Sequence, residues 1–522
     1  MRTVIRTGAV LALAGVLATG CTAAGGGPAP GGTGGTPSTA RGDAKPSAST
    51  TAPGGPALPA RLTGQKPDWR RCTAPEGGER PGSAWRCATV QVPLDYARPD
   101  GPTIPIALIR KEAGAKDARL GSLLFNFGGP GGSGVDILPR GAAEYTALGS
   151  RYDLVSFDPR GVQRSSGVVC RDDKEQAKAE RTVDYTPDTS AEENAFRADA
   201  ASFGQGCERR SGTVLPYTTT SNTARDMDLI RQVLGDAKLN YFGISYGTQL
   251  GAAYAHLFPE NVGRMVLDAV VDPTADAVGH ARNQTVGFQR ALDNYLKSTG
   301  QSPEAGTRRI VRLLEKLDRQ PLAVGDRELN DSLALTGVVM PLYAQQNWPL
   351  LTSALTKAEN GSGAELLSLA DWYNDRDASG HYSTQSHSQR AISCADSAER
   401  PTLDQARALL PEFRRLSPVF GPFLAWDTAG WCADWPVKGE STTTPVSAPG
   451  AAPILVVGTT GDPATPYEGA ERMAKALGQG VGVLVTNKGE GHGAYGSAAC
   501  VTRTVDAYLT GGKVPAYGTT CA

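Results

Sequence analysis

Several signals that would assign this chain to a common functional class are missing. Lysine plus arginine (52) nearly balance aspartate plus glutamate (53), so the net charge of −1 offers no basic field for nucleic acid. The 5 histidines stand singly and no C-x-x-C pair occurs, which argues against a zinc site. Beyond the N-terminal segment, no apolar run is long enough to cross a bilayer. We therefore expect no metal, no other cofactor and no nucleic-acid partner.

The N-terminus has the pattern of an export signal. Arg2 and Arg6 precede an apolar run at residues 9–17, and small residues lead to Cys21. This resembles a bacterial lipobox, in which Cys21 would be lipidated, although Ala18 stands three residues before it where the strict pattern has leucine. Ordinary secretory cleavage is the alternative. We expect an exported protein, held on the outer side of the cell membrane by a lipid on Cys21 or shed from it.

A flexible tether is predicted to follow the signal, since residues 23–60 are largely Gly, Pro, Ser, Thr and Ala. The chain has nine cysteines, and setting Cys21 aside leaves eight. An even number in an exported protein predicts disulfides. Sequence spacing cannot select one connectivity, and we expect neighbours to pair: Cys72 with Cys87, Cys170 with Cys207, Cys394 with Cys432, and Cys500 with Cys521.

Strand-like and helix-like segments alternate along the body, as a mostly parallel sheet requires. Between residues 276 and 446 the pattern is mainly helical. The fold class is therefore predicted as α/β, with a doubly wound core and an inserted helical lid. Apolar runs predict strands at 88–92, 103–110, 121–127, 152–158, 239–244, 262–268, 452–458 and 481–485.

A G-x-S-x-G pattern centred on Ser245 lies between a strand-like and a helix-like run. In an α/β-hydrolase this is the nucleophile elbow, where two glycines allow a bend that pushes the serine hydroxyl clear of the sheet. Half of the oxyanion hole would be the N–H after the nucleophile, on Tyr246. The other half would come from the glycine run at 128–134, and we choose Gly129 as the donor. A plain flexible loop is the alternative for that run.

The remaining triad members are expected in the order Ser, Asp, His. Asp462 follows the strand at 452–458, and His492 follows the last strand in a glycine-rich loop. Asp462 would fix the imidazole tautomer while His492 moves the proton. Asp462 in G-D-P is also an ordinary turn residue, and Asp268 and Asp272 are rival acids. Chain position favours Asp462.

With these motifs the chain resembles the secreted tripeptidyl aminopeptidase group of α/β-hydrolase serine peptidases, relatives of the prolyl aminopeptidases. The resemblance covers nearly the whole body from about Trp69 onward. One departure is Phe127, where the prolyl relatives have histidine, and it favours the tripeptidyl branch. The motifs that carry the match are N-F-G-G-P-G-G-S-G at 126–134, D-P-R-G at 158–161, Y-F-G-I-S-Y-G-T at 241–248, R-M-V-L-D at 264–268 with D-P at 272–273, C-A-D-W-P at 432–436, G-D-P-A-T-P at 461–466 and G-H-G at 491–493.

The resemblance implies a peptide substrate with a free N-terminus, cleaved through an acyl-enzyme on Ser245 without a cofactor. A partly desolvated carboxylate would best recognise the substrate ammonium. Asp396 and Asp434 are candidates, because each stands two residues after a cysteine and a Cys394–Cys432 bridge would bring them together. Two solvated acids are the simpler interpretation.

Two other functions use the same residues. A carboxylesterase-type acyl hydrolase would share the triad, because acyl chemistry does not distinguish ester from amide. A hydrolase of cell-wall peptides would differ only in specificity. A non-catalytic binding protein would normally have lost Ser245, Asp462 or His492, and all three are present. The expected organisation is a signal peptide (1–20), a tether (21–62), a first core part (63–275), a helical lid (276–446) and a C-terminal core part (447–522).

Overall fold

A computed structural model describes residues 56–75 and 78–522. The predicted signal peptide, Cys21 and most of the predicted tether lie outside the described residues. Within the described part, α1 (Ala60–Thr63) falls inside the span predicted as tether, yet its Leu62 is buried in the core. The packed body therefore includes residues just before the predicted start of the core at 63.

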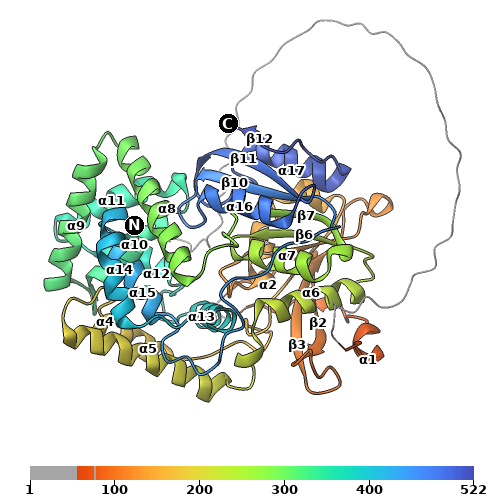
Figure 1. The fold of residues 1–522 in the computed structure, drawn as a ribbon, viewed down its shortest axis with the longest axis horizontal. Coiled ribbons are helices and arrows are strands. Elements are labelled where there is room, and N and C mark those ends of the chain that lie inside the picture. The colour runs from red at the N-terminus through yellow and green to blue at the C-terminus, as the bar shows by residue number, and fades with distance from the viewer. Residues whose placement is uncertain (1–55, 76–77) are drawn as a thin grey trace, which may run out of the picture.

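One ten-stranded sheet forms the core of the part of the molecule on the right of Figure 1. Its strand order is β1-β2-β3-β5-β4-β6-β7-β10-β11-β12. β3 is antiparallel to β2 and β5, and the pairs from β5 to β12 are parallel. The crossed order β3-β5-β4-β6 and the parallel run are those of the predicted α/β-hydrolase core. The strands are β1 (Arg70–Arg71), β2 (Trp85–Pro93), β3 (Thr103–Lys111), β4 (Ser122–Asn126), β5 (Asp153–Phe157), β6 (Leu239–Ile244), β7 (Val262–Asp268), β10 (Ile454–Gly461), β11 (Gly482–Glu490) and β12 (Thr519–Cys521).

Helices cover both faces of this sheet, which explains why its central strands are apolar on both sides. Successive residues of β7 alternate between two clusters: Met265 and Leu267 enter one, and Val266 enters the other. The first cluster is covered by α1, α6 (Thr220–Val233), α7 (Tyr246–Leu257) and α16 (Tyr467–Leu477). The second is covered by α2 (Gly134–Gly141), α3 (Thr146–Gly149) and α17 (Ala499–Gly511).

A helical subdomain with its own hydrophobic cluster stands beside the sheet (Figure 1). It contains the predicted insertion and also α4 and α5, which come from between β5 and β6 and contribute Ala179 and Phe196. α13 differs from its neighbours, because Ala391 and Ile392 pack into the core cluster instead. The elements are α4 (Asp173–Thr182), α5 (Ser190–Ser211), α8 (Ala277–Ser298), α9 (Pro303–Arg319), α10 (Asp331–Leu342), α11 (Trp348–Glu359), α12 (Ala364–Tyr373), α13 (Gln385–Asp396), α14 (Leu403–Leu416), α15 (Gly421–Gly430) and the hairpin β8 (Leu322–Val324) with β9 (Arg327–Leu329).

The start of α5 shows a signal that the sequence analysis did not use. Thr189 and Glu192 form a capping box, in which each side chain accepts from the other's backbone N–H. The helix is 22 residues long but weakly amphipathic, so apolar spacing alone does not reveal it. The T-x-x-E pattern of Thr189 and Glu192 would have been the better indicator.

Four disulfides join Cys72 to Cys87, Cys170 to Cys207, Cys394 to Cys432 and Cys500 to Cys521. These are the neighbour pairs that the sequence analysis expected. Such a set is typical of an exported protein. In the part of the chain that the structure describes, no helix is both long and apolar enough to cross a membrane.

A buried ion pair fixes the loop after β5. The guanidinium of Arg160 donates to both carboxylate oxygens of Asp226 at 2.7 Å, and both side chains are fully buried. Arg160 also donates to the carbonyls of Pro93, Leu94 and Tyr217. This pair ties the D-P-R-G loop to α6 and to the end of β2, so its donors and acceptors are satisfied without water.

We expect Asp226→Ala to lower the free energy of unfolding by about 3–5 kcal/mol, because it leaves a buried guanidinium uncompensated. Thermal melting of the purified protein measures the effect. The double variant Arg160→Met/Asp226→Leu removes both charges and should recover only part of the loss, because the carbonyls of Pro93, Leu94 and Tyr217 then lack their donor. Equal destabilisation by the single and the double variant would contradict this account.

Candidate active site

The turn at Ser245 has the geometry of a nucleophile elbow. β6 ends at Ile244, Ser245 adopts φ 59° and ψ −126°, and α7 begins at Tyr246. A non-glycine residue held in this strained conformation is uncommon away from functional sites. The side chain of Ser245 makes no capping hydrogen bond to α7, so its hydroxyl is not used to stabilise the helix and is available to react.

The two glycines of the pattern are required by close packing. A Cβ atom on Gly243 would collide with the carbonyl of Gly247, and one on Gly247 would collide with the carbonyl of Asn126. The turn therefore lies directly against the end of β4. Any larger residue at either position would push the serine out of place.

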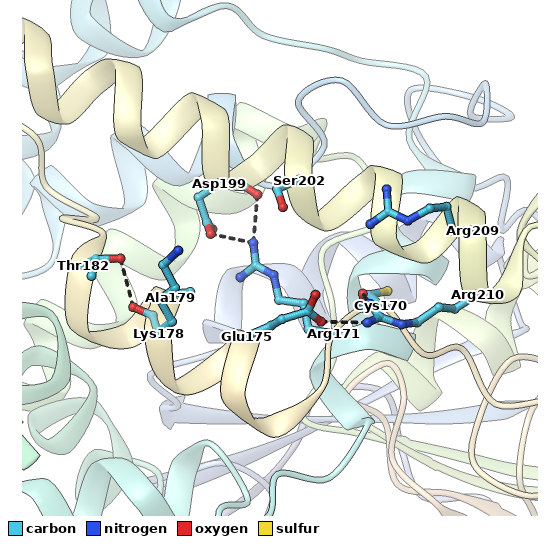
Figure 2. Close-up of a pocket in the computed structure, with 10 residues that line it drawn as sticks. All are labelled: Cys170, Arg171, Glu175, Lys178, Ala179, Thr182, Asp199, Ser202, Arg209 and Arg210. Atoms are coloured by element: carbon cyan, nitrogen blue, oxygen red, sulfur yellow. Dashed lines mark hydrogen bonds and ion pairs between the residues drawn. The ribbon is translucent and has the colours of Figure 1, made fainter. Parts of the chain in front are cut away.

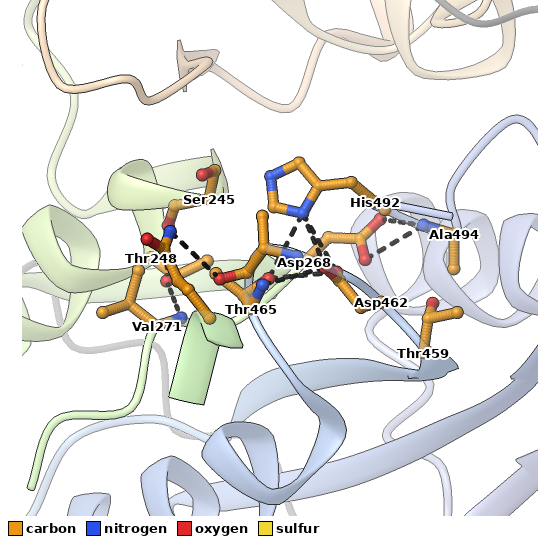
Figure 3. A network of polar contacts seen from close by, with 12 residues as sticks. Ser245, Thr248, Asp268, Val271, Thr459, Asp462, Thr465, His492 and Ala494 are labelled. Atoms are coloured by element: carbon orange, nitrogen blue, oxygen red, sulfur yellow. Dashed lines mark hydrogen bonds and ion pairs between the residues drawn. The ribbon is translucent and has the colours of Figure 1, made fainter. Parts of the chain in front are cut away.

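The imidazole of His492 lies against Asp462. Nδ1 is 2.9 Å from Oδ1 and 3.0 Å from Oδ2 of the carboxylate. In Figure 3 the opposite edge of the ring faces Ser245. With the Nδ1 proton donated to Asp462, Nε2 is free to accept the serine proton.

The carboxylate of Asp462 is held by hydrogen bonds from its own turn. Its carboxylate has no exposed surface and accepts hydrogen bonds from the N–H groups of Ala464 and Thr465 and from the Thr465 hydroxyl, at 2.9–3.0 Å. The same turn that made Asp462 a plausible structural residue thus also aims its carboxylate at the imidazole (Figure 3).

The surroundings of His492 favour its protonated form. Burial alone would lower the pKa of the imidazole, but the charge of Asp462 and its hydrogen bond outweigh that effect, with a smaller contribution from Asp268. The pKa of His492 therefore lies above its ordinary value of 6.5. An imidazole of this kind is stabilised once it has taken up a proton.

Asp268, one of the rival acids, occupies a different position. Its backbone carbonyl accepts the N–H of Ser245 at 3.0 Å. Its buried carboxylate accepts the N–H groups of Ala494 and Tyr495, at 3.0 and 2.8 Å, and burial raises its pKa. Asp268 thus holds the backbone of both the serine turn and the histidine loop. The other rival, Asp272, pairs with Arg472.

The predicted oxyanion loop lies against the serine turn. Gly128 has φ 83°, and a Cβ atom there would lie 2.5 Å from the carbonyl oxygen of Ile244 and 2.9 Å from the nitrogen of Tyr246. This contact brings the N–H of Gly129, the next residue, to the same region as the N–H of Tyr246. Among the described residues no hydrogen-bond acceptor is assigned to either N–H.

Asp158 anchors the far end of this loop. It accepts from the Ser133 hydroxyl at 2.6 Å and from the N–H of Val135 at 3.2 Å. Phe127, the departure from the prolyl relatives, stacks on Phe125 at 5.9 Å. It therefore belongs to the aromatic core that supports the loop.

The two acids proposed for amine recognition do not share an environment. Asp396 accepts from the N–H and the hydroxyl of Thr220, at 2.7 and 2.6 Å, and burial raises its pKa to about 7. The Asp434 side chain is 49% exposed and pairs with Arg197 of α5 at 3.6 Å. The Cys394–Cys432 bridge forms, but it does not turn the two carboxylates to one spot.

A cavity of about 230 Å³ lies elsewhere, at the facing sides of α4 and α5 (Figure 2). It is basic, but two of its guanidinium groups are already paired, Arg171 with Asp199 and Arg210 with Glu175. None of the predicted triad residues lines it. Within residues 56–75 and 78–522, no group of three or more His, Cys, Asp or Glu side chains has the arrangement of a metal site.

Known proteins resemble this chain over most of its length. Residues 417–521 match the family model described as TAP-like protein. Serine protease Hip1 from Mycobacterium tuberculosis is 36% identical over 492 residues, covering 88% of this chain and 91% of that protein. The tripeptidyl aminopeptidase of Streptomyces lividans is 34% identical over 482 residues, with 87% and 86% covered. Carboxylesterase B from Mycobacterium tuberculosis is 36% identical over 460 residues, with 84% and 86% covered.

Substitution of Asp462 and of Asp268 should affect the pH dependence of kcat/KM differently. Activity should fall as the pH is lowered through the pKa of His492, above 6.5, because the base must be neutral. Asp462→Asn should cost about 10⁴-fold in kcat. It should also move the acid limb to lower pH, because the charge that raises the pKa is gone.

Asp268→Asn is the matched control. Its carboxylate contacts backbone N–H groups rather than the imidazole, so we expect a smaller loss and a smaller shift of the acid limb. A larger loss and shift in Asp268→Asn than in Asp462→Asn would reverse the assignment of the acid.

Proposed function

This chain belongs to the tripeptidyl aminopeptidase-like family of α/β-hydrolases and is a serine peptidase, and we propose that it releases short peptides, tripeptides first, from free N-termini. Its substrates are peptides. The relative from Streptomyces lividans is named as a tripeptidyl aminopeptidase, which supports the length of the product.

The proposed reaction uses an acyl-enzyme. Ser245 Oγ attacks the scissile carbonyl while His492 Nε2 accepts its proton, and Asp462 stabilises the resulting imidazolium. The N–H groups of Gly129 and Tyr246 donate to the oxyanion. His492 then protonates the leaving amine, and the ester on Ser245 is hydrolysed by water that gives its proton to the same imidazole.

One observation carries the proposal: Ser245, held in a strained turn between β6 and α7, faces a histidine whose other nitrogen lies 2.9 Å from a buried carboxylate. Three segments far apart in the sequence converge on this arrangement. It can activate a hydroxyl for acyl transfer, and a purely structural network would not need the strain at Ser245.

An esterase activity is the second candidate. It is supported by the relative named Carboxylesterase B, and the same residues would carry out the chemistry. The two functions differ in what they require of the substrate N-terminus. A peptidase that counts residues from a free amine must bind that amine, whereas an esterase has no such need.

We also propose that the protein is anchored to the cell membrane through a lipid on Cys21. The support comes from the sequence of the N-terminal segment and from the four disulfides, which fit an exported body. We also propose that the helical subdomain acts as a lid over the site. It contributes the carbonyl of Tyr343, which accepts the N–H of His492 at 2.8 Å.

The exopeptidase assignment is tested with Ala-Pro-Ala-p-nitroanilide and its N-acetyl form. We expect the wild type to cleave the free-amine form at least about 10-fold faster in kcat/KM, because a charge-assisted contact is lost on acetylation. Ser245→Ala should abolish cleavage. Equal cleavage of both forms would indicate an endopeptidase, and cleavage of simple esters alone would favour the esterase.

The anchor is tested by fractionating cells that express the full chain. Wild type should be found with the membranes and Cys21→Ser in the soluble exported fraction, with unchanged peptidase activity, because the triad lies far along the chain from residue 21. Membrane association of both proteins would argue against the lipid anchor.

A further inference from the structure

One helix of the insertion connects the helical subdomain to the catalytic body. In Figure 1, α13 lies between the other helices of the subdomain and the sheet, and its Ala391 and Ile392 pack into the core cluster. Near its C-terminal end the disulfide from Cys394 to Cys432 holds it to the segment after α15. The helix is therefore fixed in place beside the candidate site.

The N-terminal part of α13 packs against the predicted oxyanion loop. Gly131 of this loop has φ 95°, and a Cβ atom there would lie 2.5 Å from the carbonyl oxygen of Gln385. The hydroxyl of Ser388 donates to the carbonyl of Gly161, in the neighbouring D-P-R-G loop, at 2.7 Å. Because Gly131 stands two residues after Gly129, α13 supports the segment that carries the first proposed donor of the oxyanion hole.

The C-terminal end of α13 reaches the second proposed donor through a chain of hydrogen bonds. Asp396 accepts from the N–H of Thr220 at 2.7 Å and from its hydroxyl at 2.6 Å. The hydroxyl oxygens of Thr220 and Tyr246 are 2.5 Å apart. An ionised carboxylate can only accept, so Thr220 donates to Asp396 and accepts from Tyr246. The chain thus runs from Tyr246 through Thr220 to α13.

This chain fixes the residue next to the nucleophile. Tyr246 is the first residue of α7 and follows Ser245 directly. Its side chain is buried in the core cluster, and Thr220 is 1% exposed. A buried ring whose hydroxyl also has a fixed partner keeps one orientation, and this holds the Tyr246 backbone in one orientation as well. The proposed N–H donor is therefore set before substrate arrives.

The same contacts account for Asp396 without a substrate amine. Both of its carboxylate oxygens already accept from Thr220. A carboxylate that anchored an ammonium would need an oxygen that faces the substrate. Asp396 instead faces the start of α6, and the residue it reaches through Thr220 carries an oxyanion donor.

We propose that Asp396 and Thr220 are positioning residues for the oxyanion hole, which hold the N–H of Tyr246 in place through its side-chain hydroxyl, while the other end of α13 supports the loop of Gly129. The inference rests on the proposed acyl-transfer chemistry and applies to esters as well as to peptides. Donors that are already oriented stabilise the tetrahedral intermediate without reorganisation at the moment of reaction.

The test begins with Thr220→Val, which keeps the shape of the side chain and removes the hydroxyl. With Ala-Pro-Ala-p-nitroanilide we expect kcat to fall about 10- to 100-fold and KM to change little, because outright loss of an oxyanion donor costs about 10²–10³-fold in kcat. Tyr246→Phe should have a similar effect. The double variant should cost little more than either change alone, since both break the same link.

Two further variants examine the rest of the chain of hydrogen bonds. Thr220→Ser keeps the hydroxyl and should retain most of the wild-type kcat. Asp396→Asn should lower kcat for the anilide and for p-nitrophenyl acetate alike, because the ester has no amine but uses the same oxyanion hole. Agreement between the two substrates separates positioning from amine recognition.

A pair of inhibitors isolates the oxyanion. With the aldehyde Ala-Pro-alaninal, Ser245 Oγ bonds to the carbonyl carbon, the serine proton passes to His492, and the carbonyl oxygen becomes an oxyanion in the hole. The alcohol Ala-Pro-alaninol has the same peptide but cannot form this bond. Thr220→Val should weaken inhibition by the aldehyde about 10-fold or more and leave inhibition by the alcohol unchanged. A general loss of structure would weaken both alike.

Ser221→Ala is the matched control. Its hydroxyl stands next to Thr220 on α6 but donates to Glu440 at 2.8 Å, so its removal should leave kcat and both inhibition constants unchanged. The end point of fluorophosphonate labelling at Ser245 gives the fraction of folded sites in each variant. All rates are normalised to that fraction, so that partial unfolding is not mistaken for a loss of catalysis.

Two results would overturn the inference. The first is an unchanged kcat together with an unchanged aldehyde-to-alcohol ratio in Thr220→Val and Tyr246→Phe. The second is a loss in Asp396→Asn confined to substrates with a free amine, which would make Asp396 the amine anchor. If the wild type hydrolyses the ester but not the anilide, the exopeptidase function fails by itself, and the ester kinetics of the same variants decide the positioning role.

Discussion

The position of the candidate site depends on Asp268, which holds two segments that are more than two hundred residues apart in the sequence. Its carbonyl receives the N–H of Ser245, and its carboxylate receives the N–H groups of the loop that carries His492. Asp268 ends β7, which lies between β6 and β10 in the sheet. The strained serine turn and the histidine loop are therefore both hydrogen-bonded to the buried end of one strand. This end lies at the edge of the sheet where the parallel strands present their carboxyl ends.

Other parts of the fold support this junction. Asp158 holds the oxyanion loop, Arg160 and Asp226 fix the next turn, and Asp462 is oriented by its own turn. Each is a buried polar group whose partners are protein atoms, so the network has little freedom to rearrange. The helical subdomain joins it through Tyr343, whose carbonyl and ring both contact His492. The helical subdomain thus touches a residue that would carry out the chemistry.

Much of this architecture could be predicted from the sequence because its signals are local. The strands are short apolar runs, and the pattern around Ser245 needs glycine at both flanks for a steric reason that the structure makes explicit at Gly243 and Gly247. The chain order of Ser245, Asp462 and His492 selected the same residues that the fold brings together. The α/β-hydrolase fold and the family membership were predicted correctly.

The features that sequence reasoning missed depend on tertiary contacts. Asp268 appeared as a rival acid, because its backbone role is invisible until the strand order is known. Asp396 and Asp434 were predicted from their spacing to two cysteines expected to pair. Spacing does not show that Asp396 already accepts a hydrogen bond from Thr220, or that Asp434 is exposed to solvent.

The most direct test of the account is the intact mass of the enzyme after acid quenching during turnover of a long peptide with a free N-terminus. The account predicts an adduct whose mass equals the N-terminal tripeptide acyl group, located on Ser245 by peptide mapping. An adduct carrying an internal fragment, or turnover without any adduct on Ser245, would contradict it.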